Sequence, residues 1–293
     1  MAKLSRPVGI LGALLALGSL TAPAQAQLAR TFVSAASGSD ANDCNRLTPC
    51  RTFQRAHDNT LAAGEITVLD AGGYGGVAIT KAISLINDGV GEAGTLVSGG
   101  VNGITISAGV SDAVSLRGLS VKGIGFGGGN GIVFNSGRSL TIENCAIRNL
   151  TGALPIGNGI VFQPSVASRL AVSNTVVADN ERIGIYVAPA GAGLAVSAAF
   201  SRVEAYNNDT GFDISGVTAT GTLNATVAES VAAGNINAGI FAVSGPGVGA
   251  AVTSVMVVRS VIANNGTGLA ANVIVACGRE LVVPTGYGAV PWS

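Results

Sequence analysis

Charged residues are scarce in this chain. They make up 11% of its 293 residues, and 16 Lys and Arg balance 16 Asp and Glu. A neutral chain offers no basic patch for the phosphates of DNA or RNA, or for an anionic membrane surface. The composition therefore predicts no nucleic-acid partner.

Histidine is almost absent, since His57 is the only one. A Ser/His/Asp triad needs a histidine beside its nucleophile, and a zinc site needs further ligands near His57. The sequence provides neither, so we interpret His57 as structural. The segment Gly123–Gly128 matches G-x-G-x-x-G, but a strand rather than a helix is expected after it, which excludes a dinucleotide site. We predict no metal and no cofactor.

The N-terminal segment 1–26 has the features of a signal peptide. Lys3 and Arg6 precede the short apolar segment Val8–Leu20, and Ala24-Gln25-Ala26 is a small-x-small cleavage site. We expect a secreted or periplasmic protein with no membrane span after cleavage. An uncleaved N-terminal anchor is the alternative.

Glycine is abundant, and seven of the 43 glycines mark a repeat, because each precedes a large apolar residue at a nearly constant spacing. The pairs are Gly103-Ile104, Gly131-Ile132, Gly159-Ile160, Gly184-Ile185, Gly211-Phe212, Gly239-Ile240 and Gly268-Leu269. A period of about 27 residues, held over seven starts, predicts a stacked repeat architecture.

Apolar residues alternate within each repeat, as at Leu140 and Ile142, and turn residues separate the runs. Alternation with period two indicates strands, and a propeller blade would need about 40 residues. The predicted fold is all-β, a right-handed parallel β-helix with a short N-terminal capping helix. We assign 27–102 to the cap and first coils, 103–273 to the β-helix coils and 274–293 to an irregular tail.

A turn asparagine recurs once per repeat, at an interval close to that of the glycines. The positions are Asn180, Asn207, Asn235 and Asn265. Asparagine tolerates left-handed backbone, and its amide can bond the same amide one coil away. We predict a stacked asparagine ladder. Ordinary turn preference is the alternative.

The segment before the first repeat is typical of an N-terminal cap. Thr48 can cap a helix that begins at Pro49 and continues from Cys50 to about Leu61. A helix over the open end of a solenoid covers backbone groups that would otherwise pair with another chain.

Four cysteines are present. Cys44 and Cys50 lie close together in a chain expected to be exported, so we predict a local disulfide. Cys145 and Cys277 are five coils apart, about 24 Å at about 4.8 Å per coil. They cannot pair, because a disulfide needs Cα atoms within about 7 Å. Cys145 is expected to be a small buried apolar side chain.

The N-terminal segment resembles the entry to pectate-lyase-like β-helix proteins, the pectin lyase superfamily. The similar residues are Thr31-Phe32-Val33-Ser34, Gly38-Ser39-Asp40 and Pro49-Cys50-Arg51-Thr52-Phe53. The resemblance extends over about residues 31 to 273. It implies the same fold, in a superfamily that includes polysaccharide lyases, glycoside hydrolases and adhesins.

The catalytic patterns of that superfamily are absent. Its members resemble one another in clustered Asp residues for Ca²⁺ with a Lys or Arg base, and here the acidic residues are scattered. One cross-coil set stands out, because Arg202, Glu229 and Arg259 follow their coil starts at nearly equal offsets. We interpret them as a surface ion-pair row, with a sugar- or acid-binding role as the alternative.

The sequence thus predicts a non-catalytic β-helix that serves as a scaffold, adhesion or glycan-binding module. Its partner would be a polysaccharide or another component of a cell surface. A polysaccharide lyase or glycoside hydrolase is the alternative, because catalytic residues can converge from several coils. Fold alone does not decide between them.

Overall fold

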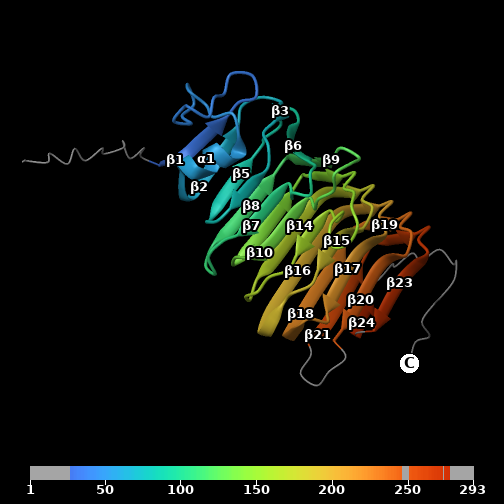
Figure 1. Ribbon diagram of the computed structural model, residues 1–293. Helices are drawn as coiled ribbons and strands as arrows, with labels where there is room; N and C mark the ends of the chain where they lie inside the picture. Colours follow the sequence, from blue (N-terminus) through green and yellow to red (C-terminus); the bar gives the residue numbers. More distant parts are fainter. Residues whose placement is uncertain (1–26, 246–250, 273, 278–293) are drawn as a thin grey trace, which may run out of the picture.

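The computed structural model describes residues 27–245, 251–272 and 274–277. They form a parallel β-solenoid of about nine turns, with the one helix at its N-terminal end (Figure 1). The predicted all-β parallel β-helix is thereby confirmed. The predicted signal peptide and residues 278–293 lie outside this range. In the described part of the chain, no helix is long and apolar enough to cross a membrane.

The described strands form two sheets, and every pairing is parallel. The eight-stranded sheet contains β4 (Val77–Ile79), β7 (Ile104–Ser107), β10 (Ile132–Ser136), β13 (Ile160–Phe162), β15 (Ile183–Val187), β17 (Thr210–Gly216), β20 (Ala238–Ser244) and β23 (Thr267–Asn272).

The sixteen-stranded sheet winds around the other sides of the solenoid. It contains β1 (Leu28–Val33), β2 (Thr60–Val68), β3 (Gly72–Gly73), β5 (Ile83–Ile86), β6 (Ala93–Val97), β8 (Ala113–Arg117), β9 (Leu119–Gly123), β11 (Ser139–Glu143), β12 (Ala146–Arg148), β14 (Arg169–Ala178), β16 (Gly191–Tyr206), β18 (Ala219–Ala228), β19 (Val231–Ala233), β21 (Val252–Val258), β22 (Val261–Ala263) and β24 (Ile274–Cys277).

The larger sheet bends at one residue in each coil. In β14 and β16 the bend falls within the strand, at Asn174 with φ 49° and at Arg202 with φ 54°. A left-handed residue turns the chain sharply without interrupting the stack of strands. Most coils therefore have three strand segments around one apolar core.

The recurring glycine–apolar pairs fall into one column. Ile160 pairs with Ile132 on one side and Ile185 on the other, and Phe212 and Ile240 continue the series. All five side chains are fully buried. The repeat seen in the sequence is thus the inward-facing column of the eight-stranded sheet.

An asparagine ladder runs beside this column. Its members are Asn180, Asn208, Asn235 and Asn265. The Oδ1 atom of Asn208 accepts from the backbone N–H and the Nδ2 of Asn180, at 3.2 and 2.9 Å. Asn235 accepts from Asn208 in the same way, and Asn265 from Asn235. Each of these Oδ1 atoms thereby satisfies the buried backbone N–H of the ladder residue one coil earlier.

Asn207 was predicted to belong to this ladder, and that prediction is wrong. Asn207 adopts a left-handed turn with φ 53°, is exposed, and donates to Asp179. The next residue, Asn208, is fully buried and carries the ladder. Asp179 and Asn264 occupy the same left-handed position before their ladder residues. The turn aims the second residue, not the first, into the interior.

The ladder explains why glycine recurs. A Cβ atom on Gly184 would lie 2.9 Å from the Nδ2 of Asn208, and one on Gly211 would lie 3.0 Å from the Nδ2 of Asn235. Carbon atoms rarely approach other side chains so closely. Glycine is therefore needed for close approach between the first strand segment and the amide stack.

A second, shorter ladder was not predicted. The Nδ2 of Asn158 donates to the Oδ1 of Asn130 at 2.9 Å, and the backbone N–H of Asn130 donates to Asn102. These asparagines directly precede Gly103, Gly131 and Gly159. The Asn-Gly pair in three successive coils is the signal that could have revealed it.

The helix that covers the N-terminal end, α1, spans Phe53–Asn59. Its N-cap is Thr52, whose hydroxyl accepts from the backbone N–H of Arg55, so the predicted start at Thr48 is wrong. The helix begins later in the chain because of Cys50, whose N–H donates to Phe32 in β1 and whose carbonyl accepts from Ser34. This pairing keeps Cys50 extended, and a helix cannot begin there.

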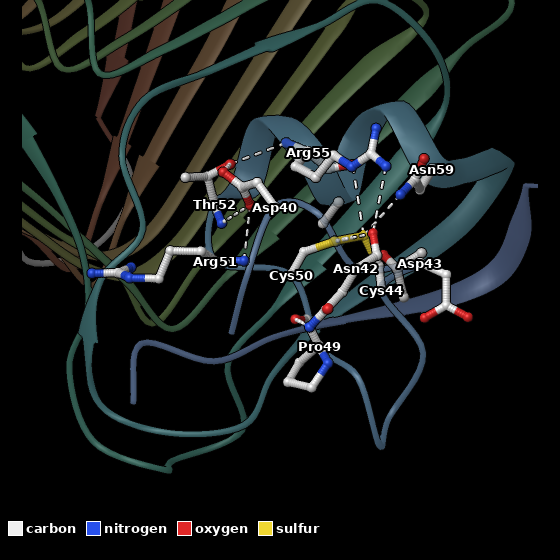
Figure 2. The surroundings of a disulfide bond; sticks show 12 residues. Asp40, Asn42, Asp43, Cys44, Pro49, Cys50, Arg51, Thr52, Arg55 and Asn59 are labelled. Atoms are coloured by element: carbon white, nitrogen blue, oxygen red, sulfur yellow. Dashed lines mark hydrogen bonds between the residues drawn. A yellow bond between two sulfur atoms is a disulfide. The ribbon is translucent and has the colours of Figure 1, made fainter. Parts of the chain in front are cut away.

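The predicted disulfide joins Cys44 to Cys50, whose Cα atoms are 4.6 Å apart. Figure 2 shows Asp40 beside it, with a carboxylate that accepts from the backbone N–H groups of Arg51 and Thr52 at 2.9 Å each. These contacts and the disulfide hold the loop that leads into α1.

Two side chains of α1 cover the free edge of β4, the first strand of the eight-stranded sheet. The Oε1 of Gln54 accepts from the N–H of Ala78, and the Nε2 of His57 accepts from the N–H of Thr80. Uncovered, these donors would form an edge for association with another chain. His57 therefore has the structural role expected of it.

Acid should weaken this cap. Burial lowers the pKa of His57, and protonated Nε2 can no longer accept from Thr80. Since the folded state disfavours the charged ring, stability is complete above the unfolded pKa of about 6.5 and is lost as pH falls below it. Thermal unfolding at pH 7.5 and 5.0 measures this effect, and the loss of stability at pH 5.0 should be smaller in His57→Gln than in the native protein. An equal loss in both proteins would contradict the role of neutral His57.

The parallel stack continues beyond residue 273. Strand β24 pairs with β21, so the prediction of an irregular tail is wrong for Ile274–Cys277. Cys145 is free and buried, as expected, and burial raises the pKa of its thiol to about 11. A neutral, enclosed thiol is chemically inert.

Candidate functional site

The predicted row Arg202, Glu229 and Arg259 lies at the bend of the larger sheet. All three residues have left-handed backbone, with φ between 45° and 54°. Glu229 lies between the arginines: one carboxylate oxygen is 2.5 Å from Arg259 and the other 3.5 Å from Arg202. The structure therefore brings the three side chains together.

This row does not form a pocket. Its three side chains are 40 to 60% exposed, and Arg202 also donates to Asn174 in the preceding coil. The hydrogen bond from Arg259 holds the pKa of Glu229 below its usual value, so Glu229 is an ionised partner rather than an acid. Exposed ion pairs of this kind contribute little to stability.

A different row lies on the outer face of the eight-stranded sheet. It consists of the residue that follows each inward apolar residue of the repeat. From the N-terminal to the C-terminal coils it contains Thr105, Val133, Val161, Tyr186, Asp213, Phe241 and Ala270. Neighbouring strands place these side chains about 4.8 Å apart.

The chemistry of the row is concentrated at Tyr186, Asp213 and Phe241. Val133 and Val161 are only 8% and 4% exposed, whereas these three reach the surface. Asp213 pairs with Tyr186 in β15 and with Phe241 in β20. A carboxyl group thus lies between two aromatic side chains. We call these three residues the aromatic–acid row.

Asp213 has an unusual environment for an acid. Its Oδ1 atom is buried and has no hydrogen-bond partner among the described residues. Burial raises the pKa of Asp213 to about 7. Burial, and then the charge of Asp213, also raise the pKa of Tyr186. A buried oxygen without a partner is costly, above all when it carries charge, so the enclosure of Oδ1 favours the neutral acid.

Uncharged polar side chains extend this face toward the N-terminal coils. Ser107, Asn135 and Gln163 are exposed at the ends of β7, β10 and β13, and the Nδ2 of Asn135 donates to the Oγ of Ser107. Hydroxyl and amide groups on the same face as aromatic rings can form hydrogen bonds with a polar, uncharged ligand that stacks on those rings.

The face has neither a metal cluster nor a pair of acids. In the described ranges no three His, Cys, Asp or Glu residues are placed to hold a metal ion. Asp213 is also the one acidic residue in the eight strands of the smaller sheet. A glycosidase of the usual kind needs two facing carboxyl groups.

The aromatic–acid row was not recognised from the sequence, where Asp213 counts as one of several scattered acids. Its signal becomes visible when the seven repeats are aligned on their glycines. The third residue of each repeat is small or aliphatic except at Tyr186, Asp213 and Phe241, which are aromatic or acidic. An acid within such a column indicates a site.

No protein-family model and no curated protein matches the chain. Two solved structures are similar to it. The A-module of mannuronan C-5 epimerase AlgE4 from Azotobacter vinelandii has a TM-score of 0.45 and 16% identity over 70% of this chain. A rhamnogalacturonan lyase has a TM-score of 0.31 and 10% identity over 87% of this chain and 89% of its own. The match spans 64% of the epimerase module.

The similarity to these two structures is therefore limited to the arrangement of strands. The structure itself defines this protein as a parallel β-solenoid with the aromatic–acid row on its outer face.

Proposed function

We propose that this protein is a secreted, carbohydrate-binding β-helix, and that it binds a glycan chain along the outer face of the eight-stranded sheet. The observation that carries the proposal is the aromatic–acid row, in which Asp213 lies between Tyr186 and Phe241 and all three residues reach the surface. Sugar rings stack on aromatic faces while their hydroxyls bond to polar atoms between those faces. The predicted signal peptide and the disulfide support export.

Binding without turnover is the function we infer. A single carboxyl group could donate a proton, but hydrolysis needs a second one across the scissile bond, and the described strands of this sheet contain none. The polysaccharide lyase or hydrolase remains the alternative activity. It is tested by a screen on pectin, alginate and neutral glycans, with and without Ca²⁺.

Removing either aromatic ring should weaken glycan binding. Tyr186→Ala and Phe241→Ala each remove one stacking surface, worth about 0.5–1.5 kcal/mol, so affinity should fall by up to about tenfold. Affinity electrophoresis or calorimetry with the polysaccharides that bind the native protein measures this directly.

The matched control is Tyr206→Ala. Tyr206 is a partly exposed aromatic residue on β16, in the other sheet. Its loss should leave affinity unchanged. Equal weakening by all three variants, or the absence of binding to every glycan, would contradict the proposed surface. Release of unsaturated or reducing products would replace the binding role with the enzymatic alternative.

A further inference from the structure

Asp213 is the one charged side chain in the eight strands of the smaller sheet. Their sequences contain no lysine, arginine, histidine or glutamate. Acidic sugars are recognised through their carboxylates, for which arginine and lysine are the usual partners. The strands of this face have no such cation to offer a uronate.

The position of Asp213 favours its neutral form. Phe212 and Ile214 on either side of it are fully buried in the core, so the carboxyl points to the outer face. There it lies between two aromatic neighbours, its own Oδ1 has no hydrogen-bond partner among the described residues, and no described Lys or Arg contributes to the shift of its pKa. A carboxylate without a counterion in such a place is strongly disfavoured.

From these contacts, and on the basis of the proposed function, we infer the class of ligand. We propose that the aromatic–acid row selects uncharged sugar residues over uronates, and that Asp213 binds them as the protonated acid. Oδ1 is enclosed by the protein, so the neutral acid offers its proton to a ligand from the other oxygen, Oδ2. A sugar hydroxyl can accept this proton.

Binding should therefore be linked to proton uptake. A sugar ring over Asp213 excludes water, which disfavours the carboxylate further. Since the pKa of Asp213 is about 7 before binding, affinity should be full at pH 6 and fall by about tenfold at pH 8.

Few other groups can titrate against Asp213. Tyr186 on β15 is a neutral phenol in this range, because burial raises its pKa further above the ordinary value of a tyrosine. Phe241 on β20 carries no charge. The strands of the larger sheet contact β17 through the core, on the side of Phe212 and Ile214.

The test uses pairs of polysaccharides with the same backbone linkage that differ at C6 alone: glucan and glucuronan, mannan and mannuronan, and methyl-esterified polygalacturonate and polygalacturonate. Calorimetry with oligosaccharides of each pair, at pH 6, 7 and 8, should show that the neutral member binds at least tenfold more tightly than the uronate. Asp213→Asn should retain the affinity of pH 6 at pH 8, because an amide donates and accepts at every pH.

Stability provides a readout that needs no ligand. A raised folded pKa means that the native state holds the proton between about pH 4 and 7 while the unfolded chain has lost it, so stability falls as pH rises through this range. Asp213→Asn should be more stable than the native protein at pH 7.5. This measurement also shows whether the variant folds.

The outcomes are distinguishable. If none of the six polysaccharides binds, both the proposed glycan-binding function and the proposed preference for uncharged sugars are contradicted. Equal or tighter binding of the uronate overturns the ligand class alone. A native affinity that stays constant from pH 6 to 8, or a folded Asp213→Asn protein without binding, overturns the role of the protonated acid alone.

Discussion

Asn208→Leu is expected to destabilise the protein by roughly 3–6 kcal/mol, since each buried polar group left unsatisfied costs about 1–3 kcal/mol. Asn208 occupies the middle of the ladder and is fully buried. Its Oδ1 accepts twice from Asn180, and its Nδ2 donates to Val177 and Asn235. Leucine matches the size of the amide, but it leaves the backbone N–H and the Nδ2 of Asn180 without their acceptor and removes the donor to Val177.

The neighbouring asparagine is the control. Asn207→Gly should change stability by no more than about 0.5 kcal/mol, because glycine accepts the left-handed turn and the lost contact to Asp179 is exposed. Chemical denaturation of both variants gives the comparison. If the two substitutions destabilise equally, the ladder does not stabilise the stack as the hydrogen bonds indicate.

Ile160→Asp should prevent folding. Ile160 is fully buried in the middle of the inward column, between Ile132 and Ile185. A carboxylate there would have no counterion and no water, and it would remove an apolar side chain from two interfaces between coils. The penalty should exceed the total stability of a typical domain, about 5–15 kcal/mol.

Two further variants make this result quantitative. Ile160→Val should fold and lose about 0.5–1.5 kcal/mol, and Gln163→Asp should be nearly neutral because Gln163 is exposed at the end of the same strand. Circular dichroism and the yield of soluble protein follow all three. A folded Ile160→Asp protein with native thermal unfolding would show that the column does not face inward.

The fold was predictable because it rests on a local pattern repeated many times. Each coil repeats the same glycine and the same alternation, so an error in one coil, such as the choice of Asn207 over Asn208, does not change the architecture. The start of the capping helix was harder to predict from the sequence, since Thr48 and Thr52 are both residues that can serve as an N-cap. The pairing of Cys50 with β1 decided between them.

The candidate site depended on the register between coils. Arg202, Glu229 and Arg259 were found because their offsets from the coil starts are nearly equal, and the structure does bring them together on the surface. Tyr186, Asp213 and Phe241 have equal offsets too. Their importance follows from burial, which leaves one oxygen of Asp213 without a partner among the described residues and raises its pKa.

The sequence by itself determined the stack: its period, its strands and its apolar interior, because period and alternation are properties of neighbouring residues along the chain. The tertiary structure alone decided which of two adjacent asparagines enters the core and where the cap begins. It also decided that one acid among many lies between aromatic rings. Those outcomes depend on contacts between residues a whole coil apart, where burial and hydrogen bonding differ at positions that look alike in sequence.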